Sequence, residues 1–182
     1  MGDPAVNHSR ACRGFSDIVA QSHGRWSSAS PCPGWDAGGI VEHVIGFHDV
    51  LLLRPLLVKP TRPKDDPATR WEMTVPAIRK AMTLASAPSP DDPDPRPDVD
   101  PARLLPALTT DVLAHTWDLA KAVGVDPRLD PELCEMSVRA ARANEEGLRS
   151  SGMFGPAVVV SGDADPATRL IALLGRDPDW VP

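Results

Sequence analysis

The sequence lacks the long apolar run that a membrane-spanning helix requires. Such a helix needs about 20 consecutive apolar residues, whereas the apolar run at residues 50–53 is stopped by Arg54 and Pro55. The N-terminal residues 1–4 also lack the basic and apolar regions of a secretory signal. We therefore expect a cytoplasmic protein that does not insert into a membrane.

Basic residues are in the minority. The chain has 19 Lys and Arg against 25 Asp and Glu, for a formal net charge of -6, and its basic residues form no cluster or stripe. Proteins that bind nucleic acid generally need such a positive surface to contact the phosphates. Nucleic acid is therefore not an expected partner.

Cysteines are few and widely spaced. The three are Cys12, Cys32 and Cys134, and no two of them form a CxxC pair. This pattern predicts reduced thiols in a cytoplasmic protein. Most lone cysteines are small packing residues. Cys32, in the rigid loop at residues 30–34, is the one whose role the sequence leaves open.

The chain does contain enough apolar sequence for one globular domain. It has 182 residues, 42% of them hydrophobic, which suits a single core. Pro and Asp fill residues 86–101, a stretch that we predict to be a loop inside a single domain spanning 1–182. Apolar periodicity, with Asp-Pro and Gly boundaries, predicts helices elsewhere. They cover residues 5–22, 37–54, 67–85, 101–124, 131–150 and 167–174.

These segments predict an all-α fold: an antiparallel bundle of about four long helices with one or two extra short helices. Pro106 is expected to delay the regular part of the fourth helix. Residues 157–160 are short, apolar and β-branched, and are expected to be an extended segment or a small strand. Asp36 is a suitable N-cap for the second helix, with Trp35 packing against its start.

The fourth predicted helix carries the pair that suggests chemistry. Asp111 and His115 are four residues apart, so their side chains stack on one face of the helix, on or beside an apolar stripe that includes Leu108 and Val112. Buried polar groups are costly unless they are satisfied. The pair is therefore either a hydrogen-bonded structural pair or part of a site for a metal ion.

The second predicted helix offers a third ligand. His43 lies among Ile40, Val44 and Phe47, on a face that should point inward, although a lone histidine there is often a satisfied core residue. Two histidines and a carboxylate suit zinc, nickel, iron or manganese, and three ligands leave a coordination position open, as in catalytic sites. His48 lies about 140° further around the helix, and we rank it below His43.

Two neighbours of His115 have weaker claims. Asp118 is a candidate to orient a metal-ligating histidine or to fix the helix against a loop, and the spacing alone favours the structural role. Trp117 is a candidate to contact a substrate. Arg149, Arg169 and Arg176 are candidates to bind an anionic substrate group, although arginines are more often solvated surface charges.

A resemblance to known proteins is carried by residues 31–36, 42–48, 111–120, 151–155 and 175–180. These stretches look like the actinobacterial metal-binding proteins of the DinB/YfiT-like superfamily, in the branch related to the N-terminal domain of mycothiol-dependent maleylpyruvate isomerase. The resemblance implies a DinB-like four-helix bundle holding a divalent metal, zinc first among the candidates. It also implies that His43, Asp111 and His115 are its ligands.

The resemblance further implies a reaction class. It points to a transferase or isomerase that uses a low-molecular-weight thiol, mycothiol, as co-substrate with a small electrophilic substrate, and to a homodimer. This sequence has Asp111 where the isomerase has a glutamate, and its 182 residues do not include the isomerase's additional C-terminal domain. We therefore expect the reaction class and not maleylpyruvate isomerisation itself.

Three functional hypotheses follow from the sequence. The first is a metal-dependent, thiol-using enzyme. The second is a metal- or ligand-binding sensor module of the same fold, without turnover. The third is a helical interaction protein in which Asp111 and His115 form only a structural pair. Stoichiometric metal binding would exclude the third, and catalysis would separate the first from the second.

Overall fold

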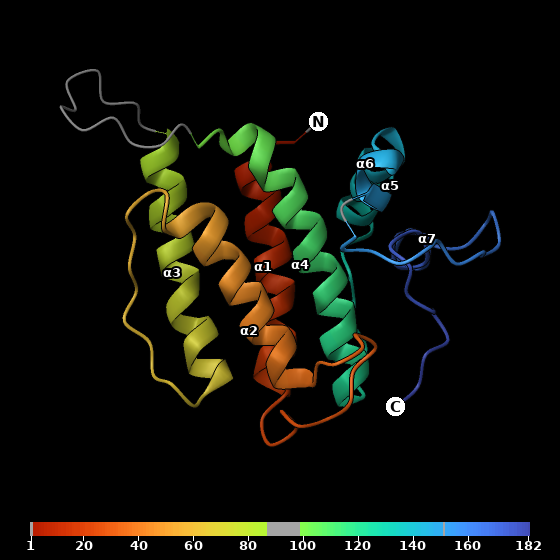
Figure 1. The fold of residues 1–182 in the computed structure, drawn as a ribbon, viewed down its shortest axis with the longest axis horizontal. Helices are drawn as coiled ribbons and strands as arrows, with labels where there is room; N and C mark the ends of the chain where they lie inside the picture. The colour runs from red at the N-terminus through yellow and green to blue at the C-terminus, as the bar shows by residue number, and fades with distance from the viewer. Residues whose placement is uncertain (1, 87–98, 151) are drawn as a thin grey trace.

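The computed structural model describes residues 2–86, 99–150 and 152–182, and the regular elements in these ranges are helices (Figure 1). The all-α prediction is therefore confirmed. An isolated antiparallel bridge joins Ala29 and Asp36. The elements are α1 (Pro4–Gln21), α2 (Ala37–His48), the π-helical turn η1 (Asp49–Leu53), α3 (Pro67–Ser86), α4 (Pro101–Val123), α5 (Pro131–Ala143), α6 (Glu145–Ser150) and α7 (Pro166–Leu173).

Aspartate followed by proline begins most of the helices. Asp3, Asp100, Asp130 and Asp165 each accept a hydrogen bond from a backbone N–H of the first turn, and a proline fills the first helical position. Proline fits there because that N–H has no partner within the helix. The helix starts predicted at Asp-Pro pairs are confirmed.

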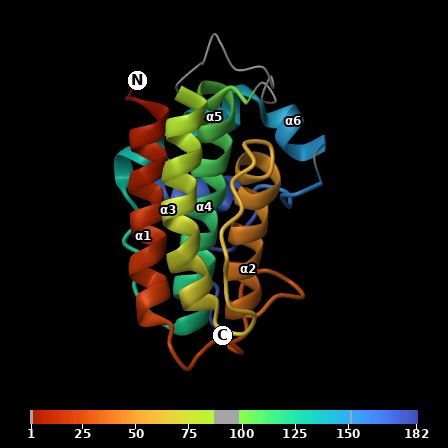
Figure 2. The same ribbon diagram turned by 90° about the vertical axis from the view of Figure 1, so that its left-hand side faces the viewer.

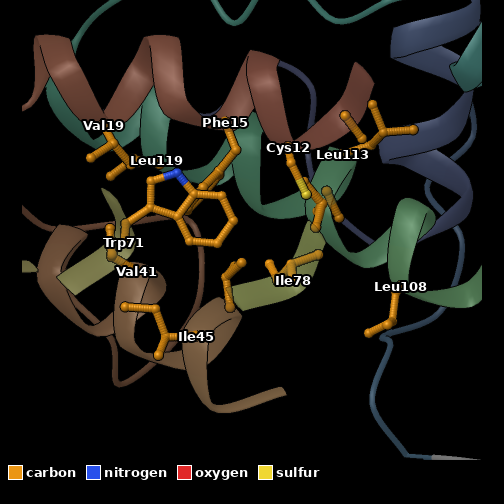
Figure 3. Packing of buried hydrophobic residues seen from close by; sticks show 14 of the residues in the cluster. Cys12, Phe15, Val19, Val41, Ile45, Trp71, Ile78, Leu108, Leu113 and Leu119 are labelled. Atoms are coloured by element: carbon orange, nitrogen blue, oxygen red, sulfur yellow. The ribbon is translucent and has the colours of Figure 1, made fainter. Parts of the chain in front are cut away.

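Four long helices lie side by side around the main core. Both α1 and α2 pack against α3 and α4 (Figures 1 and 2). Trp71 is fully buried between them, with its ring edge against Phe15 at a centroid distance of 4.8 Å (Figure 3). Its indole N–H donates to Ser16 Oγ at 2.8 Å. A buried tryptophan needs such a partner, so this contact fixes α3 against α1.

Two predicted helices end earlier than the sequence suggested. The second was expected to reach residue 54, but α2 ends at His48 and continues as the π-helical turn η1. The fifth was expected to reach residue 150, but α5 ends at Ala143. Asn144, at φ -132° and ψ 41°, separates it from α6. Short polar side chains favour such breaks because they compete for backbone hydrogen bonds.

Two further local expectations can be compared with the structure. The delay expected at Pro106 is wrong, because α4 begins at Pro101 and contains Pro106. Pro106 has no N–H to donate to the carbonyl of Ala102. Because Ala102 is exposed, water can hydrogen-bond to that carbonyl instead. Residues 157–160 form no strand, but the Val158 N–H donates to the carbonyl of Ala172 at 2.9 Å. Most of the loop predicted at 86–101 lies outside the described residues.

The C-terminal segment packs beside α4 and brings its own side chains to that helix. Arg149 of α6 donates hydrogen bonds to the carbonyls of Gly155 and Leu173. Gly175 has a left-handed φ of 82°, and a Cβ at this position would lie 2.8 Å from the Gly155 carbonyl. This close approach sets the direction of the chain into Arg176.

Substitution of Gly175 by alanine should destabilise the protein more than the same change at Gly124. Both glycines have left-handed φ angles, but nothing lies within 4 Å of a Cβ at Gly124. We expect Gly124→Ala to cost about 1–2 kcal/mol for its backbone conformation. Gly175→Ala should cost about 1–3 kcal/mol more from overpacking. Urea denaturation measures both, and equal losses would show that the Gly155 contact is unimportant.

Candidate metal centre

The packing of α2 against α4 brings the three predicted ligands together. His43 comes from α2, and Asp111 and His115 come from α4. One ligand atom from each lies within 4.8 Å of the others. Both histidine Nε2 atoms are 3.5 Å from Asp111 Oδ1. Two ligand atoms on one tetrahedral zinc ion lie roughly 3.3 Å apart, given bonds of about 2.0–2.1 Å. The spacing therefore suits a shared cation.

Asp111 has an unsatisfied oxygen. The residue is 8% exposed, and its Oδ2 atom has no hydrogen-bond partner among the described residues. Burial opposes its ionisation, but the hydrogen bonds and charges of His115 and His43 outweigh that effect and hold the Asp111 pKa well below its usual range. A buried carboxylate with a free oxygen is costly, and a metal ion bound by both oxygens of Asp111 would satisfy it.

His115 is held by a second carboxylate. Its Nδ1 lies 2.9 Å from Asp118 Oδ2, so the Nδ1–H donates to Asp118 and leaves Nε2 facing Asp111. Metal-ligating histidines usually have such a partner. Burial lowers the His115 pKa, but hydrogen bonds to Asp111, Asp118 and Cys32 raise it well above its usual value. The same negative surroundings would stabilise a metal ion in place of the proton.

Asp118 also fixes the C-terminal segment. Arg176 donates to it through Nη2 at 2.9 Å and through Nε at 3.3 Å, and the Cys32 thiol donates to Asp118 Oδ2 at 3.1 Å. The Asp118 side chain is fully buried. The sequence favoured a structural role for Asp118 over a role in orienting a histidine. In the structure the same carboxylate makes both kinds of contact.

The three candidate ligands open into a cleft of about 540 Å³, a size that suits a small molecule. Trp35 forms part of its wall, with its ring 4.5 Å from the His43 ring and 5.8 Å from the His115 ring. Phe47 stacks on the other side of His43, at 5.5 Å. The remaining lining comes from the 31–33 loop and the C-terminal segment: Pro31, Cys32, Pro33, Met153, Phe154, Gly155, Leu174, Gly175 and Arg176.

Two of the residues given weaker claims lie elsewhere. Trp117 is not part of the cleft lining, and Lys121 Nζ lies 5.3 Å from its ring centroid. His48 is fully buried and its Nε2 lies 3.0 Å from His8 Nε2. Neither residue is in position to touch a molecule in the cleft.

Sequence reasoning missed part of this site. The sequence predicts that Trp35 packs at the start of the second helix, but it does not predict the contact of Trp35 with both histidines. It offers Arg176 as a substrate-binding group or a solvated surface charge, whereas the Arg176 side chain is only 11% exposed and is paired with Asp118. The sequence shows only that Trp35 precedes the N-cap Asp36 and that Arg176 follows Gly175. Neither pattern shows what the side chain faces.

Cys32 should be the reactive thiol of the native protein. Burial raises the pKa of Cys12 and of Cys134 to about 12, whereas Cys32 is partly exposed in the cleft. Iodoacetamide reacts with thiolates, so native protein should be alkylated at Cys32 alone and denatured protein at all three. Peptide mass spectrometry measures this. Equal labelling of Cys12 or Cys134 in folded protein would contradict it.

No helix among the described residues is both long and apolar enough to cross a membrane. This agrees with the absence of a long apolar run in the sequence.

Two proteins of Mycobacterium tuberculosis are similar to this chain along nearly its whole length. They are the uncharacterized protein MT0763 of strain CDC 1551 / Oshkosh and the uncharacterized protein Rv0738 of strain ATCC 25618 / H37Rv. Each is 29% identical over 179 residues, which cover 96% of this chain and 98% of the relative. No family model matches the chain, and no solved structure matches it. Neither name states an activity.

Proposed function

We propose that the protein is a divalent-metal-dependent enzyme that uses a low-molecular-weight thiol. It either transfers the thiol to a small electrophilic substrate or uses the thiol to isomerise that substrate. The observation that carries the proposal is the unsatisfied Oδ2 of buried Asp111, beside two histidines at the base of an open cleft. Buried polar atoms are normally paired with protein, water or an ion. A metal ion accounts for the unsatisfied oxygen.

The ligand set indicates a catalytic centre and not a structural one. Structural zinc sites are usually closed by four ligands, while catalytic sites leave a position for water or substrate. His43, Asp111 and His115 would hold the ion and leave that position facing the cleft. When bound there, the ion would lower the pKa of a thiol and hold it as thiolate. Zinc is our first candidate, with nickel, iron and manganese as alternatives.

The chain's own residues would position and shield the reactants. Asp118 holds His115 in the tautomer whose Nε2 faces the cation. Trp35 and Phe47 pack on His43 and restrict its ring. The Cys32 and Arg176 side chains both line the cleft and contact Asp118. Met153 and Phe154 also line the cleft and would offer apolar surface to the electrophile.

We further propose that the packed helices α1 to α4 are a DinB-like four-helix bundle, and that mycothiol is the thiol. The support is the order of the motifs in the sequence and the meeting of a ligand on α2 with two on α4. A cytoplasmic homodimer is part of the same proposal. Asp111 is one methylene shorter than glutamate, which permits a different choice of metal from that of the isomerase.

A fluorescence assay tests the proposal. Protein loaded with zinc is mixed with mycothiol and bromobimane, an electrophile whose thiol adduct fluoresces. We expect adduct formation to exceed the rate without protein by roughly tenfold or more, and His43→Ala to remove the excess. Metal binding with no acceleration of any electrophile tested would favour the sensor module. Absence of metal binding would favour a structural Asp111–His115 pair.

A further inference from the structure

A second group of metal-ligating side chains lies inside the helical core, away from the cleft. His8 and Cys12 are four residues apart on α1, and His48 is the last residue of α2. His8 and His48 are fully buried, and Cys12 is 5% exposed. Their ligand atoms lie within 4.8 Å of one another. None of the three lines the cleft of the candidate metal centre.

Counting protons shows that either neutral tautomer of His8 leaves one of its two ring contacts without a hydrogen bond. The Nδ1 of His48 lies 2.6 Å from the Val44 carbonyl, so its N–H donates there and its Nε2 has only a lone pair. The Thr109 hydroxyl donates to the Leu105 carbonyl at 2.7 Å. The hydroxyl can then only accept, so the 3.3 Å contact with His8 Nδ1 is a hydrogen bond only when His8 carries its proton on Nδ1. In that tautomer His8 Nε2 is also a lone pair, 3.0 Å from that of His48. In the other tautomer His8 Nε2 donates to His48, and His8 Nδ1 faces the Thr109 oxygen without a hydrogen bond.

Protons alone resolve this contact poorly. Turning the Thr109 hydroxyl toward His8 would exchange a 2.7 Å hydrogen bond for one of 3.3 Å. Protonating either ring would place a charge in the core, and burial lowers the pKa of His8 to about 3 and also lowers that of His48. The Cys12 thiol lies 3.5 Å from His8 Nε2, and its single proton can serve only one of the two nitrogens.

We propose that His8, Cys12 and His48 bind a thiophilic metal ion at a site separate from the cleft. A sulfur and a nitrogen bonded to one tetrahedral ion at about 2.3 and 2.0–2.1 Å lie roughly 3.5 Å apart, which is the separation of Cys12 Sγ and His8 Nε2. The Nε2 atoms of His8 and His48, 3.0 Å apart, would be the two nitrogen ligands. Binding displaces the Cys12 proton to solvent and leaves a thiolate on the metal.

The ligand set limits which ion fits. Thiolate and imidazole ligands suit copper(I) and zinc. With copper(I), one thiolate and two neutral imidazoles give a net charge of zero, which suits a fully buried site. Zinc would leave one positive charge there. An ion at this position would clamp the start of α1 to the end of α2, next to η1, so its role is to stabilise the fold and it does not meet substrate.

The test uses a variant in which the cleft site is removed. His43→Ala/His115→Ala protein is produced in medium supplemented with copper or, separately, with zinc, and is dialysed against a chelator. We expect one equivalent of copper or zinc to remain, because the ligands are buried and exchange slowly. Elemental analysis counts it, and the two supplements decide which ion the site takes. Retention of neither ion would overturn the proposal.

Matched cysteine variants assign the thiolate. Cys12→Ser, added to the same background, should lose the ion, whereas Cys134→Ser, at another fully buried cysteine, should keep it. Retention in Cys12→Ser, or equal loss in both, would overturn the assignment. Circular dichroism checks that each variant folds. If Cys12→Ser does not fold, the metal count of the His43→Ala/His115→Ala protein still decides, since it leaves the buried cluster intact.

Discussion

Replacing His43 or His115 by alanine is expected to abolish chelator-accessible metal binding. The wild-type protein should bind one equivalent of divalent metal in the cleft, and each variant should bind it more than about 100-fold more weakly. Loss of a residue that only hydrogen-bonds to a metal ligand already weakens metal affinity about 10–100-fold. Competition with a chromogenic chelator measures the affinity, and elemental analysis measures the stoichiometry.

The control is another histidine. His23 is exposed, with its ring 6.2 Å from that of Trp26, so His23→Ala should bind metal like the wild type. Wild-type affinity in His43→Ala would show that the ligand assignment is wrong. Absence of chelator-accessible metal from the wild type, even with zinc, nickel, manganese and iron(II) in turn, would leave the Asp111–His115 pair as a structural feature.

Two substitutions at Asp111 sharpen the result. Asp111→Asn keeps the size of the side chain but removes its charge, and should lose most of the affinity. Asp111→Glu keeps the charge and lengthens the side chain by one methylene. It should retain metal, with an altered preference among zinc, nickel and manganese. If Asp111→Asn binds as tightly as the wild type, the unsatisfied oxygen is not a ligand.

Local sequence patterns predicted the helices well where a helix has a sharp start. Aspartate and proline at a helix start act within one turn, so Asp100-Pro101 or Asp165-Pro166 can be read from neighbours alone. Helix ends were less predictable. The π-helical turn after His48 and the break at Asn144 depend on packing around them, and neither residue type enforces such a change by itself.

The same distinction applies to the site. Asp111 and His115 share a helix face, so periodicity predicts that they meet, and the inward stripe of α2 predicts His43. The contact of Arg176 with Asp118 joins residues 58 apart, and that of Cys32 with Asp118 joins residues 86 apart. No helical period relates them. The pairing of His8 with His48 was missed for the same reason, since it joins α1 and α2.

Substitution of Asp118 by alanine is expected to damage both stability and metal binding. Arg176 would keep a largely buried charge without its ionic partner, and removing one member of a buried pair costs about 3–5 kcal/mol. His115 would lose the acceptor that fixes its tautomer, which should weaken metal binding about 10–100-fold. Urea denaturation of metal-free protein gives the first quantity, and chelator competition gives the second.

Arg176→Met separates these two effects. It removes the charge but leaves the Asp118 contact with His115 in place, so metal affinity should change much less than in Asp118→Ala. The double variant Asp118→Ala/Arg176→Met no longer contains an unpaired arginine, and its stability loss should be smaller than the sum of the single losses. Additive losses would show that the two side chains are energetically independent. Non-additive stability together with a metal defect specific to Asp118 would make this carboxylate the link between the C-terminal segment and the metal centre.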